Sequence, residues 1–337
     1  MNKIIKKMIL RTICQLKLPK LLHKSIVKND LTIITYHGII DKQLKVPDWC
    51  FLEKDQFCKQ IDYLKKTFNV LHLSKAVELI KKGQLEDSIA VITFDDGFQN
   101  NFDIAFPILK DAGIPATIFL TTKYIDTADT LWFCKFNNAF NRTLKKVLHW
   151  NGKQFDIDST EKKTKAAIKL QIKLKSLPTL QMRHEVKTII GQLYNNHDYQ
   201  VELDSPYRML SINAIRKMKE PGLIEFGAHS HTHEILSKLS FKEKKEEIKK
   251  SISEFEKIVK TPCRLFSYPN GGVNDFDDET ICILESFGIE TAVSMIPGPN
   301  IYTTPLMSLR RYGIRNDISI EKFKTLVHHL NWKYNKF

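Results

Sequence analysis

Two adjacent carboxylates follow an apolar, β-branched run in the first third of the chain. Residues 90–92 lead through a Thr-Phe pair to Asp95, Asp96 and Gly97. Such a run predicts a buried strand, and parallel α/β sheets carry their chemistry at the carboxyl ends of strands. Neighbouring buried carboxylates repel each other and lose hydration, so the pair indicates a bound cation or divided roles. Alone, it would fit an ordinary Asp-Gly turn that closes a strand.

Histidines cluster much further along the chain. Three of the 11 histidines fall at His229, His231 and His233. The spacing of the outer two suits ligands one helical turn apart or on a tight loop. Two neutral imidazoles and one carboxylate form the open three-ligand site of hydrolytic zinc, with the fourth position left to water or substrate. A solvated polar loop is the alternative, but the aspartate pair favours a metal site, with His231 facing away from it.

The order of these motifs resembles the polysaccharide deacetylases, the family with the NodB homology domain, carbohydrate esterase family 4. The resemblance covers roughly residues 31–329 and rests on T-F-D-D-G at 93–97 followed by H-S-H-T-H at 229–233. The Tyr-His pair at 36–37 places the chain near the branch with this motif at the start of the domain. The family implies an α/β fold, a distorted or incomplete (β/α) barrel. It also implies a hydrolase that removes N-acetyl groups from an amino sugar of a polysaccharide or lipid-linked glycan precursor of the cell envelope.

The resemblance also implies roles for individual residues. Asp96, His229 and His233 would bind a divalent metal, with zinc expected ahead of cobalt, manganese or nickel, and Asp95 would be the general base. A carboxylate that does not bind the metal keeps its lone pairs free to take a proton from water. His37 would be the general acid, although a hydrogen-bonded histidine at a strand end is a competing interpretation. The motif Leu-Val-His at 326–328 matches a late family pattern, but it falls in an expected terminal helix and is set aside.

The chain departs from the family at the third motif. Many members have an arginine there that pairs with the catalytic aspartate, whereas this chain has Ser267. Arg311 is the expected substitute, because the resembling branch carries an L-x-R run at this place, and Arg264 is a weaker candidate. The loop that follows Ser267 is expected to hold the oxyanion and substrate, with the Tyr268 N–H as donor; its residues are Tyr268, Pro269 and Asn270.

Alternating apolar runs and amphipathic segments predict parallel βα units and a barrel-like sheet. Strands are expected at 31–36, 90–92, 116–120, 224–226, 265–266 and 291–294. Helices are expected at about 54–67, 74–80, 241–255, 280–287 and 320–330, with another that ends near Gly113. Ser74 is expected to cap the second helix, and Ser240 with Glu243 forms a capping box. Between about 126 and 205 the helical periodicity is strong and no strand is convincing. This segment is expected to be a helical insertion in a deacetylase domain spanning 31–337.

Composition limits the partners. The 337 residues carry a net charge of +14, which favours anionic partners, and six scattered cysteines without a C-x-x-C pair indicate buried thiols in a reducing compartment. Nucleic acid is not expected, because aromatics do not interleave with a basic stripe. Residues 1–30 form a basic amphipathic segment without the pattern of a cleaved signal. We expect a cytoplasmic protein that contacts the anionic inner membrane face, a packed first helix being the alternative.

Three functions remain open at this point. The leading one is a metal-dependent deacetylase acting on a glycan. The second has the same site but hydrolyses a different amide bond, as a deformylase or other amide hydrolase acting on a lipid-phosphate-linked sugar. The third is an inactive glycan-binding member, supported only by Ser267 at the usual arginine position.

Overall fold

The computed structural model describes residues 28–86, 88–194 and 205–330, together with 202 and positions 11–12, 14, 16, 18–19 and 21–22. The basic amphipathic segment predicted at 1–30 lies mostly outside the described residues, so its membrane contact stays a prediction. Within the described part of the chain, no helix is both long and apolar enough to span a bilayer.

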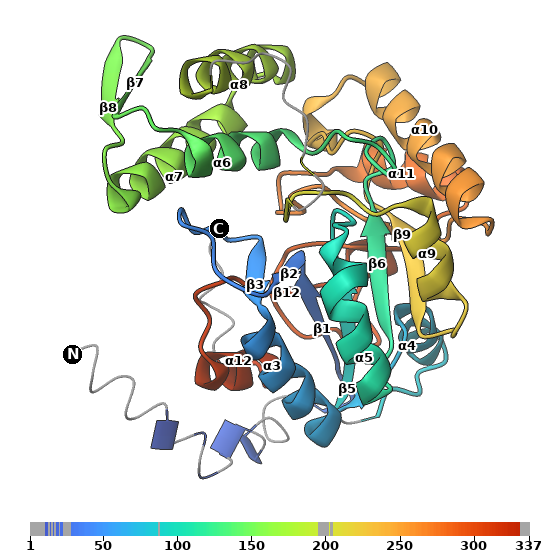
Figure 1. The fold of residues 1–337 in the computed structure, drawn as a ribbon. Helices are drawn as coiled ribbons and strands as arrows, with labels where there is room; N and C mark the ends of the chain where they lie inside the picture. Colours follow the sequence, from blue (N-terminus) through green and yellow to red (C-terminus); the bar gives the residue numbers. More distant parts are fainter. Residues whose placement is uncertain are drawn as a thin grey trace.

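A curled parallel sheet forms the centre of the protein (Figure 1). The order of the main strands is β11 (Thr291–Val293), β10 (Leu265–Ser267), β9 (Ile224–Ala228), β6 (Ala116–Leu120), β5 (Ile89–Phe94), β1 (Leu31–Tyr36) and β12 (Tyr312–Gly313). A further short strand, β4 (Asn69–Val70), also pairs with β5. An isolated parallel bridge joins Val293, in the edge strand β11, to Leu309, just before the opposite edge strand β12. The two edges of the sheet therefore approach each other, which agrees with the expected distorted barrel.

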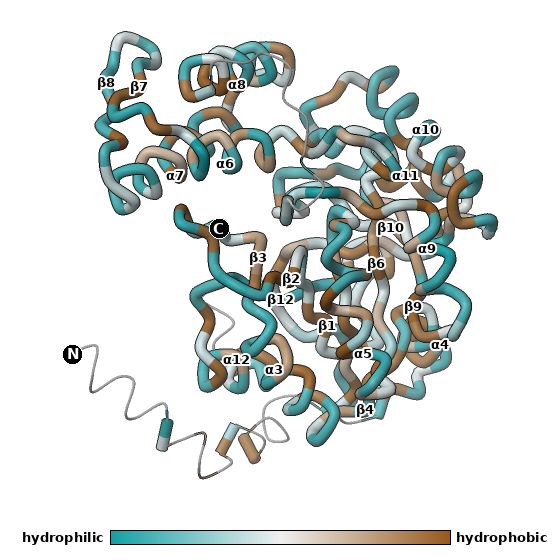
Figure 2. The backbone as a smooth tube through the Cα atoms, in the orientation of Figure 1, coloured by the Kyte–Doolittle hydropathy of each residue, from teal (hydrophilic) through white to brown (hydrophobic). Residues whose placement is uncertain are grey.

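The central strands are buried along their whole length. β1, β5 and β6 read LTIITY, IAVITF and ATIFL, and every residue in them is buried. Near-continuous apolar runs of this kind are typical of parallel strands covered on both faces. Figure 2 shows the hydrophobic residues gathered in these strands and the hydrophilic ones on the outer helices. Cys50, Cys134 and Cys263 are buried, but Cys282 is exposed, so the expectation of uniformly buried thiols was wrong in part.

Helices cover the sheet, and most begin and end where local signals predict. Ser240 and Glu243 form the expected capping box. The predicted cap at Ser74 was wrong: the helix begins at Leu73 with His72 at its N-cap, and the Ser74 N–H donates to the Glu225 carboxylate at 3.1 Å. The covering helices are α3 (Lys54–Thr67), α4 (Leu73–Lys81), α5 (Phe106–Ala112), α9 (Ile212–Lys219), α10 (Phe241–Val259), α11 (Asp278–Ser286) and α12 (Ile320–Val327).

Short elements complete the domain near the strand ends. β2 (Gly38–Ile40) and β3 (Phe51–Glu53) form a small parallel pair. A π-helical turn, η1 (Asn101–Ala105), precedes α5, and two 3₁₀ turns lie at η2 (Leu236–Lys238) and η3 (Leu306–Ser308). None of these was predicted, because their sequences carry no periodicity of their own.

The insertion forms a second hydrophobic core after β6. Its helices are α6 (Trp132–Arg142), α7 (Thr160–Ser176) and α8 (Thr179–Leu193). The prediction that it holds no strand was wrong, because β7 (Val147–Trp150) and β8 (Lys153–Asp156) form an antiparallel hairpin. Asn151 and Gly152 make the turn with φ of 48° and 67°, and Asn-Gly is the usual sequence signal for such a hairpin.

Polar contacts hold the insertion against the rim formed by the carboxyl ends of the strands (Figure 1). At one side, Asn137 of α6 donates to the buried Asp48 carboxylate at 2.5 Å. At the other, Thr179 and Arg183 of α8 both contact the carboxylate of Glu234. The insertion is thus attached to the barrel at two separate places above the predicted site.

Candidate active site

The chain turns sharply where β5 ends, and this turn brings both aspartates to one side. Asp96 has a φ of 73°, and the Gly97 N–H donates to the Asp95 carbonyl at 2.9 Å, which forms a γ-turn. In a regular strand, consecutive side chains point to opposite faces, so Asp95 and Asp96 would point apart without this turn. A left-handed non-glycine residue costs about 1–3 kcal/mol, and such strain concentrates at functional sites.

Asp96 meets two histidines from the loop after β9. Its Oδ1 lies 3.5 Å from His229 Nε2 and 3.3 Å from His233 Nε2. One ligand atom from each of the three residues lies within 4.8 Å of the others. The structure therefore brings together the three residues predicted as metal ligands, although they come from two separate parts of the sequence.

The chemistry of this cluster fits a divalent cation. Asp96 is fully buried, and neither of its carboxylate oxygens has a hydrogen-bond partner, an arrangement that is costly without a compensating charge. His229 Nδ1 lies 2.8 Å from the Ser267 carbonyl, so that nitrogen carries the proton and Nε2 keeps its lone pair. Burial lowers the pKa of His229 to about 4, which keeps its imidazole neutral and able to bind metal at pH 7.

The histidine segment is a tight loop and not a helical turn. Ser230 and His233 both have left-handed backbone, with φ of 61° and 62°. The carboxylate of Glu247 on α10 accepts the backbone N–H groups of His231 and Thr232 at 2.9 and 2.5 Å. The His231 side chain faces Thr122 at 3.0 Å and takes no part in the cluster, as its odd position predicted.

Arg311 reaches Asp95 from the far end of the chain. Its Nη1 and Nη2 lie 2.8 and 2.7 Å from the two carboxylate oxygens, a bidentate pair in which the arginine is fully buried. Ser267, at the usual arginine position, donates to Asp95 Oδ1 at 3.2 Å and accepts from Arg311 Nη2 at 2.9 Å. Arg311 therefore makes the pairing with Asp95 that was expected of the missing arginine, whereas Arg264 pairs with Glu290 in an exposed ion pair.

These contacts determine the charge of Asp95. Burial by itself raises the pKa of Asp95, but the charge and hydrogen bonds of Arg311, together with the nearby His229 and His37 rings, outweigh it and hold the pKa well below its ordinary value. A carboxylate can accept about four hydrogen bonds, two on each oxygen. Oδ1 of Asp95 accepts from both Arg311 and Ser267, whereas Oδ2 accepts only from Arg311 among the described residues. An ionised Asp95 thus keeps an acceptor position on Oδ2.

His37 lies on the same rim. Its side chain is nearly buried, its Nδ1 has no hydrogen-bond partner, and its ring packs edge-on against Trp49 at 4.9 Å. It is close enough that a positive charge on its ring lowers the pKa of both Asp95 and Asp96. An unpartnered imidazole does not fit the competing interpretation of a hydrogen-bonded structural histidine.

The third-motif loop corrects one prediction. The Tyr268 N–H donates to the Val293 carbonyl at 3.2 Å within the sheet, and the Tyr268 ring stacks on Phe276 at 4.0 Å. Tyr268 is therefore a structural residue, because its N–H is already used in pairing with β11. Among the described residues, the Asn270 N–H has no partner; Asn270 has a φ of 59° in a tight turn that begins at Pro269. Of these two N–H groups, only that of Asn270 is left without a partner among the described residues.

The insertion contributes residues that the sequence did not reveal. Phe133 of α6 packs against His233 with ring centroids 5.4 Å apart. Lys175 at the end of α7 donates to Asn270 Oδ1 at 3.3 Å, and burial lowers the pKa of its ammonium. Both line, with His233 and Asn270, a cavity of about 30 Å³, which is room for about one water molecule. Helical periodicity predicted the helices of the insertion, but nothing in it marked which side chains reach the rim.

The fold and the site together define a parallel-barrel protein with an Asp-His-His cluster and an arginine-paired aspartate at the carboxyl ends of its strands. The polysaccharide deacetylase family model matches residues 82–292, more than half of the chain. The chain belongs to the polysaccharide deacetylase family.

Individual relatives agree with this assignment. A poly-β-1,6-N-acetyl-D-glucosamine N-deacetylase of Staphylococcus epidermidis is 28% identical over 176 residues, which are 51% of this chain and 58% of that protein. A second relative, from Bacillus subtilis, is 33% identical over 98 residues, which are 28% of this chain and 33% of that protein. The chain thus spans less than two thirds of the length of either curated relative.

Solved structures share the fold at low sequence identity. The Streptococcus pyogenes deacetylase PplD has a TM-score of 0.59 and 16% identity, covering 89% of this chain and 99% of its own. IcaB from Ammonifex degensii has a TM-score of 0.56 and 15% identity, covering 88% of this chain and 95% of its own.

Proposed function

We propose that the protein is a metal-dependent hydrolase that removes N-acetyl groups from an amino sugar of a glycan. The observation that carries the proposal is the buried Asp96 carboxylate, without a hydrogen-bond partner, facing two histidine nitrogens beside an ionised Asp95. The Staphylococcus epidermidis relative is named for N-deacetylation of poly-β-1,6-N-acetyl-D-glucosamine, which supports an N-acetylated amino sugar as substrate.

Each side chain then has a distinct task. Asp96, His229 and His233 would hold the cation, zinc first among the candidates, which supplies Lewis acidity and lowers the pKa of water. Asp95 takes the proton of the attacking water on its remaining Oδ2 position, while Arg311 keeps it ionised and oriented.

Other groups act on the leaving side and on the developing charge. His37 donates a proton to the departing amine, which leaves as a neutral group. The Asn270 N–H donates to the carbonyl oxygen as negative charge develops on it. Phe133 and Trp49 exclude bulk water around these groups and so strengthen the electrostatic interactions among them.

The test separates metal binding from proton transfer. Asp96→Ala and His233→Ala are expected to lose both bound metal and acetate release, because each removes a ligand. Asp95→Asn is expected to keep the metal and to lose turnover by roughly a hundredfold or more. His231→Ala is the matched control from the same loop, since its side chain faces Thr122, and it should keep both properties. Metal content by elemental analysis and acetate release from N-acetylated oligosaccharides are the two measurements.

Wild-type protein that retains no stoichiometric divalent metal after mild purification would contradict the proposal, as would an active Asp96→Ala variant. Assaying formate beside acetate distinguishes a deacetylase from a deformylase on the same site. The inactive-member hypothesis rested on Ser267, and the contact of Arg311 with Asp95 removes that support.

A further inference from the structure

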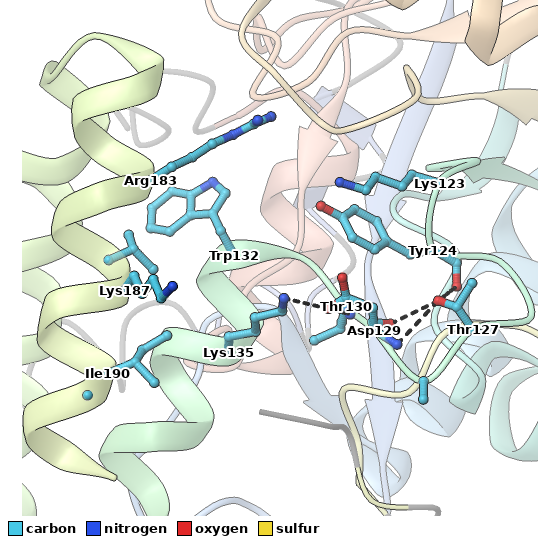
Figure 3. Close-up of a pocket in the computed structure, with 13 residues that line it drawn as sticks. Lys123, Tyr124, Thr127, Asp129, Thr130, Trp132, Lys135, Arg183, Lys187 and Ile190 are labelled. Carbon is cyan, nitrogen blue, oxygen red and sulfur yellow. Dashed lines mark hydrogen bonds and ion pairs between the residues drawn. The ribbon is translucent and has the colours of Figure 1, made fainter. Parts of the chain in front are cut away.

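A second, larger pocket lies where the insertion meets the barrel. It has a volume of about 720 Å³ and is enclosed by α8, the start of α6 and the segment 123–130 that follows β6 (Figure 3). This volume is within the range of small-ligand sites in proteins. The lining side chains that matter here are Lys123, Tyr124, Trp132, Lys135, Arg183 and Lys187.

The walls of this junction pocket are strongly cationic. Four basic side chains line it against a single carboxylate, Asp129, which pairs with Lys135 at 2.5 Å. Arg183 is partly neutralised by Glu234. Lys123 and Lys187 have no ion pair with any residue that the structure describes, and they come from opposite walls, one from the barrel and one from α8. Figure 3 shows the Lys123 and Arg183 side chains reaching into the space from these two sides. Excess positive charge in a concave site raises the local concentration of anions.

Aromatic residues connect the junction pocket to the metal cluster. The Trp132 side chain lines both this pocket and the small cavity beside His233. The rings of Trp132 and Phe133 lie 5.8 Å apart, and Phe133 lies 5.4 Å from His233. One aromatic pair therefore separates the junction pocket from the predicted chemistry. Tyr124 adds a second aromatic wall, with the Lys123 ammonium 5.5 Å from its ring.

We propose that the junction pocket binds an anionic sugar unit of the substrate, next to the unit that is deacylated. This inference rests on the proposed function, because it takes the ligand to be part of the same glycan. Trp132 supplies an apolar face for a sugar ring, and the ammonium groups of Lys123 and Lys187 bind the negative group. That group is a carboxylate on the sugar or a phosphate attached to it, since both chemistries suit unpaired ammonium ions. A neutral glycan would leave these cations without a counter-charge.

The experiment measures binding and does not depend on turnover. Probes are titrated calorimetrically into wild-type protein and into Asp95→Asn protein at low salt. They are neutral chitotetraose, a hyaluronan tetrasaccharide that carries carboxylates, and N-acetylglucosamine 1-phosphate. Lys123→Gln and Lys187→Gln test the pocket. Lys165→Gln is the control, because it removes the same charge from an exposed ion pair with Glu161 on α7.

The expected result is an anionic probe bound roughly tenfold or more tightly than the neutral tetrasaccharide, a difference that high salt reduces. Lys123→Gln and Lys187→Gln should each remove most of the difference, and Lys165→Gln should not. Preference for the carboxylated or the phosphorylated probe identifies the source of the negative charge.

Equal affinity for neutral and anionic probes would overturn the inference, as would a charge preference that survives both pocket substitutions. Absence of measurable binding of either anionic probe would also overturn it. Because the experiment measures binding affinity and not turnover, the pocket proposal and the proposed deacetylase function can be refuted independently. A protein that shows the preference but releases no acetate refutes the proposed function alone, and one that deacetylates neutral glycan without the preference refutes the pocket alone.

Discussion

Replacing Arg311 by methionine would leave Asp95 as an unpaired carboxylate at the centre of the barrel. The arginine makes six hydrogen bonds there, and both residues are almost completely buried. Methionine fills similar space but donates nothing. Removing one partner of a buried ion pair costs about 3–5 kcal/mol, a large share of the 5–15 kcal/mol that typically stabilises a folded protein.

The same substitution should move the pH dependence in a defined direction. Arg311 holds the pKa of Asp95 below its ordinary value although burial raises it. The pair therefore contributes stability that is present above the ordinary aspartate pKa and is lost as the pH falls through the folded pKa. Without Arg311 the pKa rises, and the acidic limb of kcat/KM should shift upward by about one to three pH units.

Two further variants keep this prediction testable if Arg311→Met does not fold. Arg311→Lys retains a charge but loses the bidentate geometry, so it should show a smaller shift in the same direction. Arg311→Met combined with Asp95→Asn removes the unpaired charge and should recover roughly 2 kcal/mol of unfolding free energy relative to Arg311→Met. Urea unfolding, monitored by circular dichroism, measures the free energy of unfolding of each variant. Initial rates across a pH range give the position of the acidic limb of kcat/KM.

The reasoning would be refuted by an Arg311→Met protein that unfolds at the same urea concentration as wild type and keeps the acidic limb in place. Equal stability of Arg311→Met with and without Asp95→Asn would also refute it, because the loss would then come from packing and not from an unpaired charge.

Two other substitutions test how the rim is supported. Glu247→Ala removes the carboxylate that holds the histidine loop, so metal affinity should fall roughly 10- to 100-fold in a competition titration, while the exposed neighbour Glu246→Ala should leave it unchanged. Gly227→Ala would put a Cβ 2.6 Å from the Phe119 ring and 2.8 Å from the Leu265 carbonyl, and should cost about 1–3 kcal/mol in urea unfolding. Unchanged stability in this variant would mean that β9 and its neighbours can separate without strain.

The sequence determined the features that depend on neighbouring residues. The strand at 31–36 and the helix at 54–67 lie where their patterns predict, because periodicity and flanking residues act over a few positions. The residue types at the site were readable for the same reason: Asp95 and Asp96 end an apolar run, and the histidines share one short segment. The Asn-Gly signal for the β7–β8 hairpin was equally local, and the dominant helical pattern around it hid it.

Only the tertiary structure decided which groups meet. Arg311 could be proposed from its motif, but the partners of its six hydrogen bonds lie at the ends of three strands, β1, β5 and β10, and in the loop after β11. The use of the Tyr268 N–H by Val293, and the reach of Lys175 to Asn270, depend on strand pairing and on how the insertion docks. Parallel strands bring their carboxyl ends to one rim from distant parts of the chain, and the registers that align them are set by core packing across the whole sheet. No local pattern carries that information.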